Sequence, residues 1–131
     1  MNRLITLIIL LLCTANSLEL FAQRSIVADQ LPQVVIEGKI ESATPFSSIT
    51  FKFYKDYISF EELEYSAIVK DQSFSITLPI HDPTPGFITY NNQTLPIFIE
   101  RGDNLFIHST HDHFIDSLEF SQLGALRNNF L

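Results

Sequence analysis

Hydrophobic and polar residues alternate along most of the chain beyond residue 33, and a period of two is typical of half-buried β-strands. The first such run covers residues 34–41, where Gly38 marks a possible β-bulge. The second run, residues 49–54, follows a turn that contains Pro45. The alternation therefore predicts two strands in the first third of the domain.

Two further runs, residues 62–70 and 74–80, are separated by a short polar connection, Lys70-Asp71-Gln72-Ser73. This spacing predicts that the two strands pair as a hairpin. Residues 81–85 contain two prolines, which cannot donate hydrogen bonds inside a sheet, so we expect a loop there.

Residues 86–91 and 94–100 predict another pair of strands, joined around Asn92, because asparagine tolerates the positive φ that tight turns require. Pro96 places the second strand of this pair at a sheet edge or at its own end.

Short strands at residues 105–109 and 118–121 complete the pattern. Seven or eight short strands at this spacing predict an all-β fold, an antiparallel β-sandwich over residues 33–121. Only residues 122–131 change to helical spacing, which predicts the start of a C-terminal helix. The apolar residues at this spacing are Leu123, Leu126 and Phe130.

Residues 1–22 have the pattern of a secretory signal peptide, with Arg3 before an apolar segment of about ten residues. Cleavage after Ala22 fits best, and cleavage after Ser17 is the weaker alternative. The apolar segment is too short to span a bilayer, which needs about 20 apolar residues. We therefore expect an exported protein of the periplasm or outer envelope, with a linker at residues 23–32 and no transmembrane segment after cleavage.

Cys13 raises a competing interpretation, since bacterial lipoproteins are acylated on a cysteine next to the cleavage site. Leu12 stands where a small residue is expected, which argues against lipidation. Because Cys13 is the chain's one cysteine, a chain cleaved after Ala22 carries no disulfide, thiol nucleophile or zinc-thiolate site of its own.

The composition fits one domain: 131 residues, 46% hydrophobic, with 12 phenylalanines to build a core. The formal net charge is −7, and removal of residues 1–22 takes away one base and one acid and leaves that charge unchanged. No basic surface is predicted that would neutralise phosphates, so nucleic acid is not an expected partner.

The segment His108-Ser-Thr-His111-Asp-His113 is one candidate for chemistry, because imidazole is a common ligand of Zn²⁺ and Cu²⁺. In an extended segment His111 and His113 would share a face. The more common explanation is a polar surface loop, and we expect no metal, no cofactor and no catalytic residue.

Asp56, Glu61, Glu62 and Glu64 form a local acidic cluster that is able to hold a hard cation such as Ca²⁺. No calcium-loop spacing accompanies them. A solvated strand face that protects a sheet edge is the favoured interpretation.

Two tripeptides match patterns of sugar attachment. Asn92-Gln93-Thr94 is an N-glycosylation sequon, and Asp116-Ser117-Leu118 resembles the acceptor for O-glycosylation of exported Bacteroidetes proteins. Chance occurrence is the favoured explanation, and Ser117 is a conditional modification site.

Aromatic residues are the remaining candidates for binding. Tyr54 falls on the same face of its strand as Lys52, opposite Phe51 and Phe53, and an exposed aromatic there would stack on a sugar or on a partner's side chain. Cross-strand packing of the tyrosine on a partly covered sheet face is the favoured interpretation. The same two interpretations, ligand stacking or packing, apply to Phe46, Tyr57 and Phe60. Lys52 and Lys55 flank Tyr54.

Several segments in their order along the chain resemble one bacterial domain: VVIEGKIE, ITFKFY, VKDQSFSITLP, LPIFIERGDNLFI and EFSQLGALRNNFL. This is the β-rich domain of unassigned function that precedes the thioredoxin-like domain in exported disulfide-reductase-like proteins of Bacteroidetes. The resemblance covers about residues 33–131. Its most specific parts are Gly102-Asp103, Gly124-Ala125 and residues 128–131.

The resemblance implies an accessory or interaction domain, with a thioredoxin-like domain or another envelope protein as partner. Asp71-Gln72 departs from the Gly-containing turn usual in this family, and no thioredoxin fold with paired cysteines follows in the sequence. No redox role is therefore carried over to any residue. A stand-alone glycan- or protein-binding sandwich is the alternative, and a histidine-based metal-binding protein the third.

Overall fold

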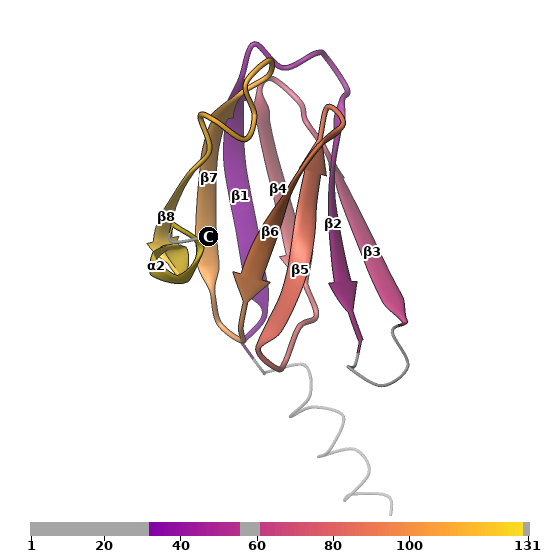
Figure 1. Ribbon diagram of the computed structural model, residues 1–131, viewed down its shortest axis with the longest axis vertical. Helices are drawn as coiled ribbons and strands as arrows, with labels where there is room; N and C mark the ends of the chain where they lie inside the picture. The colour runs from indigo at the N-terminus through magenta and orange to yellow at the C-terminus, as the bar shows by residue number, and fades with distance from the viewer. Residues whose placement is uncertain (1–31, 56–60, 130–131) are drawn as a thin grey trace, which may run out of the picture. The chain divides into compact units, whose positions relative to one another are not determined.

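The computed structural model describes residues 32–55 and 61–129, which form two stacked sheets and one short helix (Figure 1). The predicted all-β sandwich of seven to eight strands, followed by the start of a helix, is confirmed. The elements are β1 (Val34–Glu41), β2 (Ser48–Tyr54), β3 (Glu62–Ile68), β4 (Ser73–Leu78), β5 (Thr84–Tyr90), β6 (Gln93–Ile99), β7 (Asn104–Thr110), β8 (Glu119–Leu123) and α2 (Ala125–Asn128). The predicted signal peptide at residues 1–22, Cys13 and all but the last residue of the linker lie outside the described residues.

Each sheet has four strands. One has the order β4-β1-β7-β8 and the other the order β3-β2-β5-β6. All neighbours are antiparallel except β1 and β7, which run parallel. A parallel pair needs a crossover connection, and the chain between β1 and β7 supplies one by passing through the other sheet.

The predicted hairpin of β3 with β4 is wrong, because the two strands belong to different sheets: β3 pairs with β2, and β4 pairs with β1. The turn between them is tight all the same. Lys70 and Ser73 exchange two backbone hydrogen bonds, and Asp71 and Gln72 both have positive φ. The chain thus makes a two-residue turn but changes sheets within it.

Gly38 is not a bulge. It pairs in continuous register with Phe74 on one side and Ile107 on the other. A Cβ at this position would lie 2.5 Å from the Phe74 ring and 2.7 Å from the Ile107 carbonyl oxygen. Glycine is therefore needed for close packing rather than for an irregular backbone.

The prolines mark the limits of pairing in the β3-β2-β5-β6 sheet. Pro96 lies in β6, the edge strand, as predicted. The predicted loop at residues 81–85 is too long by two residues, because Thr84 and Pro85 already pair with β6. Pro85 fits in the strand because the pairing with β2 on its other side begins only at Gly86.

The turn around Asn92 is confirmed, with φ of 47° at Asn91 and 60° at Asn92. The last strand is Glu119–Leu123 instead of residues 118–121, since Gln122 and Leu123 still pair with β7. The helical segment predicted from residue 122 therefore begins too early: Gly124, with φ of 99°, ends β8, and α2 begins at Ala125. Leu123 and Leu126 are exposed, and α2 buries Ala125 and Asn128 instead.

The core lies between the sheets. It consists mainly of the inward-pointing residues of the strands, together with Phe114 from the segment between β7 and β8. Its largest fully buried side chains include Phe51, Phe53, Tyr90 and Phe114. In the described parts of the chain no helix is long and apolar enough to cross a membrane. The outward face of each sheet carries the side chains that point away from the core, and the outward face of the β3-β2-β5-β6 sheet includes the exposed ring of Phe87.

Candidate functional site

The outward side of the β3-β2-β5-β6 sheet, called the outer face below, is built in three rows by the strand register. The first row is Ser66, Thr50, Thr89 and Thr94, and the second is Glu64, Lys52, Phe87 and Pro96. The third contains Glu62 opposite Tyr54, and Pro85 opposite Phe98. Rows on one face are two residues apart along each strand, about 7 Å. The face therefore changes from hydroxyl groups to aromatic rings and prolines along its strands.

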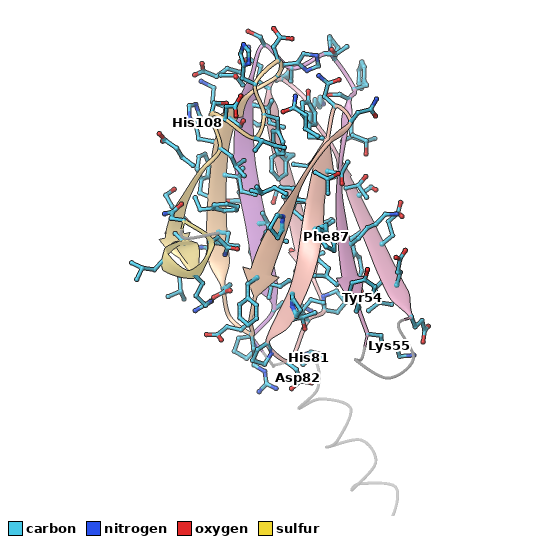
Figure 2. The ribbon with its side chains drawn as sticks, viewed as in Figure 1. Tyr54, Lys55, His81, Asp82, Phe87 and His108 are labelled. Atoms are coloured by element: carbon cyan, nitrogen blue, oxygen red, sulfur yellow. The ribbon has the colours of Figure 1, made fainter. Side chains whose placement is uncertain are left out.

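The aromatic end of the outer face is hollowed. A cavity of about 210 Å³ is lined by Tyr54, Pro85, Phe87, Pro96 and Phe98, together with Gly86 and Ile97. Phe87 is 40% exposed, and Figure 2 shows it on β5, with Tyr54 at the end of β2. We call this cavity the aromatic hollow. Its lining is almost entirely apolar.

A second, wider depression of about 560 Å³ adjoins it and is lined by Thr50, Lys52, Glu64, Phe87, Thr89 and Thr94. We call it the polar hollow. Phe87 is common to both linings and thus lies where the two hollows meet.

The charges of the polar hollow neutralise each other. Lys52 Nζ lies 3.2 Å from a carboxylate oxygen of Glu64, and this hydrogen bond and the negative charge of Glu64 raise the pKa of Lys52. The hydroxyl row is also internally bonded, with Thr50 and Ser66 oxygens 3.1 Å apart and those of Thr89 and Thr94 3.0 Å apart. Hydroxyls can still accept and donate further hydrogen bonds to a ligand.

The prediction for Tyr54 is confirmed in part: it shares the outer face with Lys52 and is half-buried. Phe46 is 76% exposed in the loop before β2, at the end of that strand opposite Tyr54. Tyr57 and Phe60 lie outside the described residues. The sequence reasoning missed Phe87 and Phe98, although the alternation of β5 and β6 already placed both opposite buried isoleucines.

The three histidines of the predicted metal site have separate partners. His108 Nε2 lies 3.2 Å from a carboxylate oxygen of Glu41, and both residues belong to the β4-β1-β7-β8 sheet. His111 Nδ1 lies 2.8 Å from the Tyr90 hydroxyl, which also bonds Ser47, and His113 is an exposed loop residue. Across residues 32–55 and 61–129, no three His, Cys, Asp or Glu side chains come together as a metal site.

Two carboxylates of the predicted acidic cluster pair with separate lysines, one in β2 and one directly after it. Glu64 pairs with Lys52 and Glu61 with Lys55, the latter at 2.9 Å. Asp56 lies outside the described residues. Since β3 is an edge strand, these carboxylates fit the favoured interpretation of a solvated edge.

The Ser117 hydroxyl is engaged in the fold. It donates to the His113 carbonyl at 2.6 Å, accepts from the Thr110 amide at 2.9 Å and lies 3.0 Å from the Ser109 hydroxyl. Attachment of a sugar in the folded state would break this network. Asn92, the sequon asparagine, is exposed in its turn.

The residues most specific to the family resemblance meet in one cluster beside α2. Arg127 donates to both carboxylate oxygens of Asp103, one at 2.6 Å, and also pairs with Glu100 at 3.0 Å. Asp103 further accepts a hydrogen bond from the Glu100 backbone N–H at 2.9 Å, which closes the turn before β7. A Cβ on Gly124 would lie 2.7 Å from the Asp103 carboxylate, so only glycine fits there.

Two adjacent asparagines attach this cluster to both sheets. The Asn128 side chain accepts a hydrogen bond from the backbone N–H of Phe98, on β6, at 2.7 Å. It also donates a hydrogen bond to the Phe98 carbonyl at 2.9 Å. Asn129 makes the same pair of bonds with Phe120 on β8, at 3.2 and 3.0 Å. Each side-chain amide thus replaces a missing strand at one sheet edge.

Comparison with known proteins gives no matching family model and no matching curated protein. One solved structure is similar, the oligosaccharyltransferase of Archaeoglobus fulgidus in complex with Zn and sulfate, with a TM-score of 0.45 and 17% identity. The similarity covers 60% of this chain and 12% of that chain, and it carries no conclusion about function.

Proposed function

We propose that the chain is a non-catalytic, exported interaction domain that binds through the outer face of its β3-β2-β5-β6 sheet. The family resemblance adds that it serves as an accessory module of a thioredoxin-like envelope protein. The aromatic hollow is the observation that carries the proposal, because a sheet face turned to solvent is expected to be polar.

The charged groups that line the polar hollow are held in an ion pair. Glu64 raises the pKa of Lys52 and so favours its charged form, which leaves a fixed donor and a fixed acceptor for a partner to bind.

Replacement of one ring tests this proposal. Phe87→Ser should abolish co-sedimentation of the purified chain with insoluble envelope material of the producing cell, because it removes the ring shared by both hollows. Since Phe87 is 40% exposed, the fold should tolerate the change, and circular dichroism should confirm this.

Phe106→Ser is the matched control. Phe106 is half-buried on the outward side of the other sheet, where it pairs with Glu37 and Ser121. This variant should co-sediment as the unchanged chain does. Equal binding by the unchanged chain and Phe87→Ser, or equal loss in both variants, would contradict the outer face as the binding surface.

A further inference from the structure

The two hollows of the outer face share Phe87, so a ligand that covers both meets aromatic rings and prolines on one side and, on the other, side chains that carry hydroxyl, ammonium and carboxylate groups. We propose that this ligand is a neutral oligosaccharide of pyranose sugars. The inference rests on the proposed function, since it names the ligand of the same face.

The apolar side of the match is the stacking of a sugar ring. A pyranose presents a face of C–H groups, and an exposed aromatic ring packs against such a face without a polar partner. Phe87 supplies a ring with 40% of its surface exposed, and Tyr54 and Phe98 lie in the same hollow. Pro85 and Pro96 extend the apolar surface beside them.

The polar side of the match is the hydrogen-bonding capacity next to Phe87. Thr50, Thr89 and Thr94 present hydroxyls, and Lys52 and Glu64 present a donor and an acceptor. Hydrogen bonds to these two charged groups are stronger than those between neutral groups, and they suit the hydroxyl groups at the rim of a sugar.

Other ligand classes fit less well. A purely apolar ligand would cover Lys52 and Glu64 without giving either a new hydrogen bond, which is unfavourable. An anionic ligand would meet a lysine already neutralised by Glu64, on a chain with a net charge of −7. The two adjoining hollows, of about 210 and 560 Å³, favour a chain of sugars over a single ring.

The test is a titration of the isotopically labelled chain with three neutral oligosaccharides, maltohexaose, cellohexaose and mannohexaose, followed by amide NMR shifts. At least one should shift amides of β2, β5 and β6 together. Phe87→Ala should weaken that binding at least about tenfold, the loss expected for an aromatic stacking partner. Thr94→Val, which keeps the shape of the side chain, should weaken it less, and Phe106→Ala should leave it unchanged.

A proline-rich peptide serves as the competing probe. If none of the three sugars shifts outer-face amides at millimolar concentration, or if only the peptide does, the oligosaccharide inference is wrong. In that case Phe87-dependent binding to envelope material would still support the interaction domain. If that binding is absent as well, both proposals fall.

Discussion

Asp103 is a carboxylate with only 3% of its surface exposed, and the fold surrounds it with donors from the Arg127 guanidinium and the Glu100 amide. A buried charge is tolerated when a partner and hydrogen bonds accompany it, and removing the partner leaves the full desolvation cost. Gly124 packs so closely against the Asp103 carboxylate that a Cβ there would lie 2.7 Å from it. At the scale of single residues, this ion pair is therefore expected to be sensitive to loss of either partner.

Arg127→Met should lower the free energy of unfolding by about 3 kcal/mol, because it strands the Asp103 charge while keeping most of the side-chain volume. Breaking a fully buried ion pair costs about 3–5 kcal/mol, and the lower value applies here because the Arg127 side chain is 34% exposed. Urea denaturation measures the change. Arg101→Met is the control, because Arg101 is exposed and donates one bond to the His81 carbonyl at 3.2 Å, so a loss of at most about 1 kcal/mol is expected. Similar losses in both variants would contradict the role of Asp103.

A pH effect is expected at Glu41. The hydrogen bond from His108, and then the positive charge of Lys39, lower the pKa of Glu41 below its ordinary value of 4.5. Because the pKa is lowered in the folded state, the stabilisation is fully present above pH 4.5 and is lost as the pH falls through the folded-state pKa.

His108→Ala should therefore raise the pKa of Glu41 toward 4.5, as followed by NMR titration of its side-chain carboxyl carbon. Lys39→Gln should raise it by less, since the His108 hydrogen bond is the larger cause. An unchanged Glu41 titration in His108→Ala would show that the contact is not maintained in solution.

At the scale of elements, α2 has only four residues and is too short to be stable alone. Its position depends on Asn128 and Asn129, whose amides bond the two edge strands β6 and β8. Opposite residues in an antiparallel pair alternate between bonding each other and bonding outward, and the N–H and C=O of Phe98, opposite Pro85, both point to the free edge of β6, where Asn128 binds them. The helix thus holds the β6 and β8 edges of the two sheets together.

Asn128→Ala should speed hydrogen exchange of the Phe98 amide and lower the free energy of unfolding by about 1–3 kcal/mol, the cost of unpaired backbone groups. Asn129→Ala provides the matched comparison: it should expose the Phe120 amide and leave that of Phe98 protected. Exchange measured residue by residue by NMR distinguishes the two. Loss of protection at both sites in both variants would mean that the segment detaches as a unit.

At the scale of the whole molecule, the outer face arises because distant strands are placed side by side. Tyr54 of β2, Phe87 of β5 and Phe98 of β6 come from three strands and line one hollow. The sequence placed Tyr54 on the correct side of its strand, because alternation fixes the side on which a residue points. It did not place the three rings together, since that requires the register between strands.

The wrong hairpin has the same cause. Residues 62–70 and 74–80 both alternate, and the turn between them has the positive φ values of a tight hairpin turn. Alternation cannot tell whether a strand joins its sequence neighbour or crosses to the other sheet, because both choices bury the same residues. β3 and β4 lie at matching edges of opposite sheets, so the turn joins two layers.

The sequence by itself determined the strands, most of the turns, the edge position of Pro96 and the presence of a helix after the last strand. These features depend on local periodicity and backbone preference, which neighbouring residues encode. Only the tertiary structure decided which strands share a sheet, why Gly38 must be a glycine, and that Asp103 and Arg127 form a pair. Those features depend on contacts between residues far apart in the chain, and the same holds for the ring of Phe87 that joins the two hollows of the outer face.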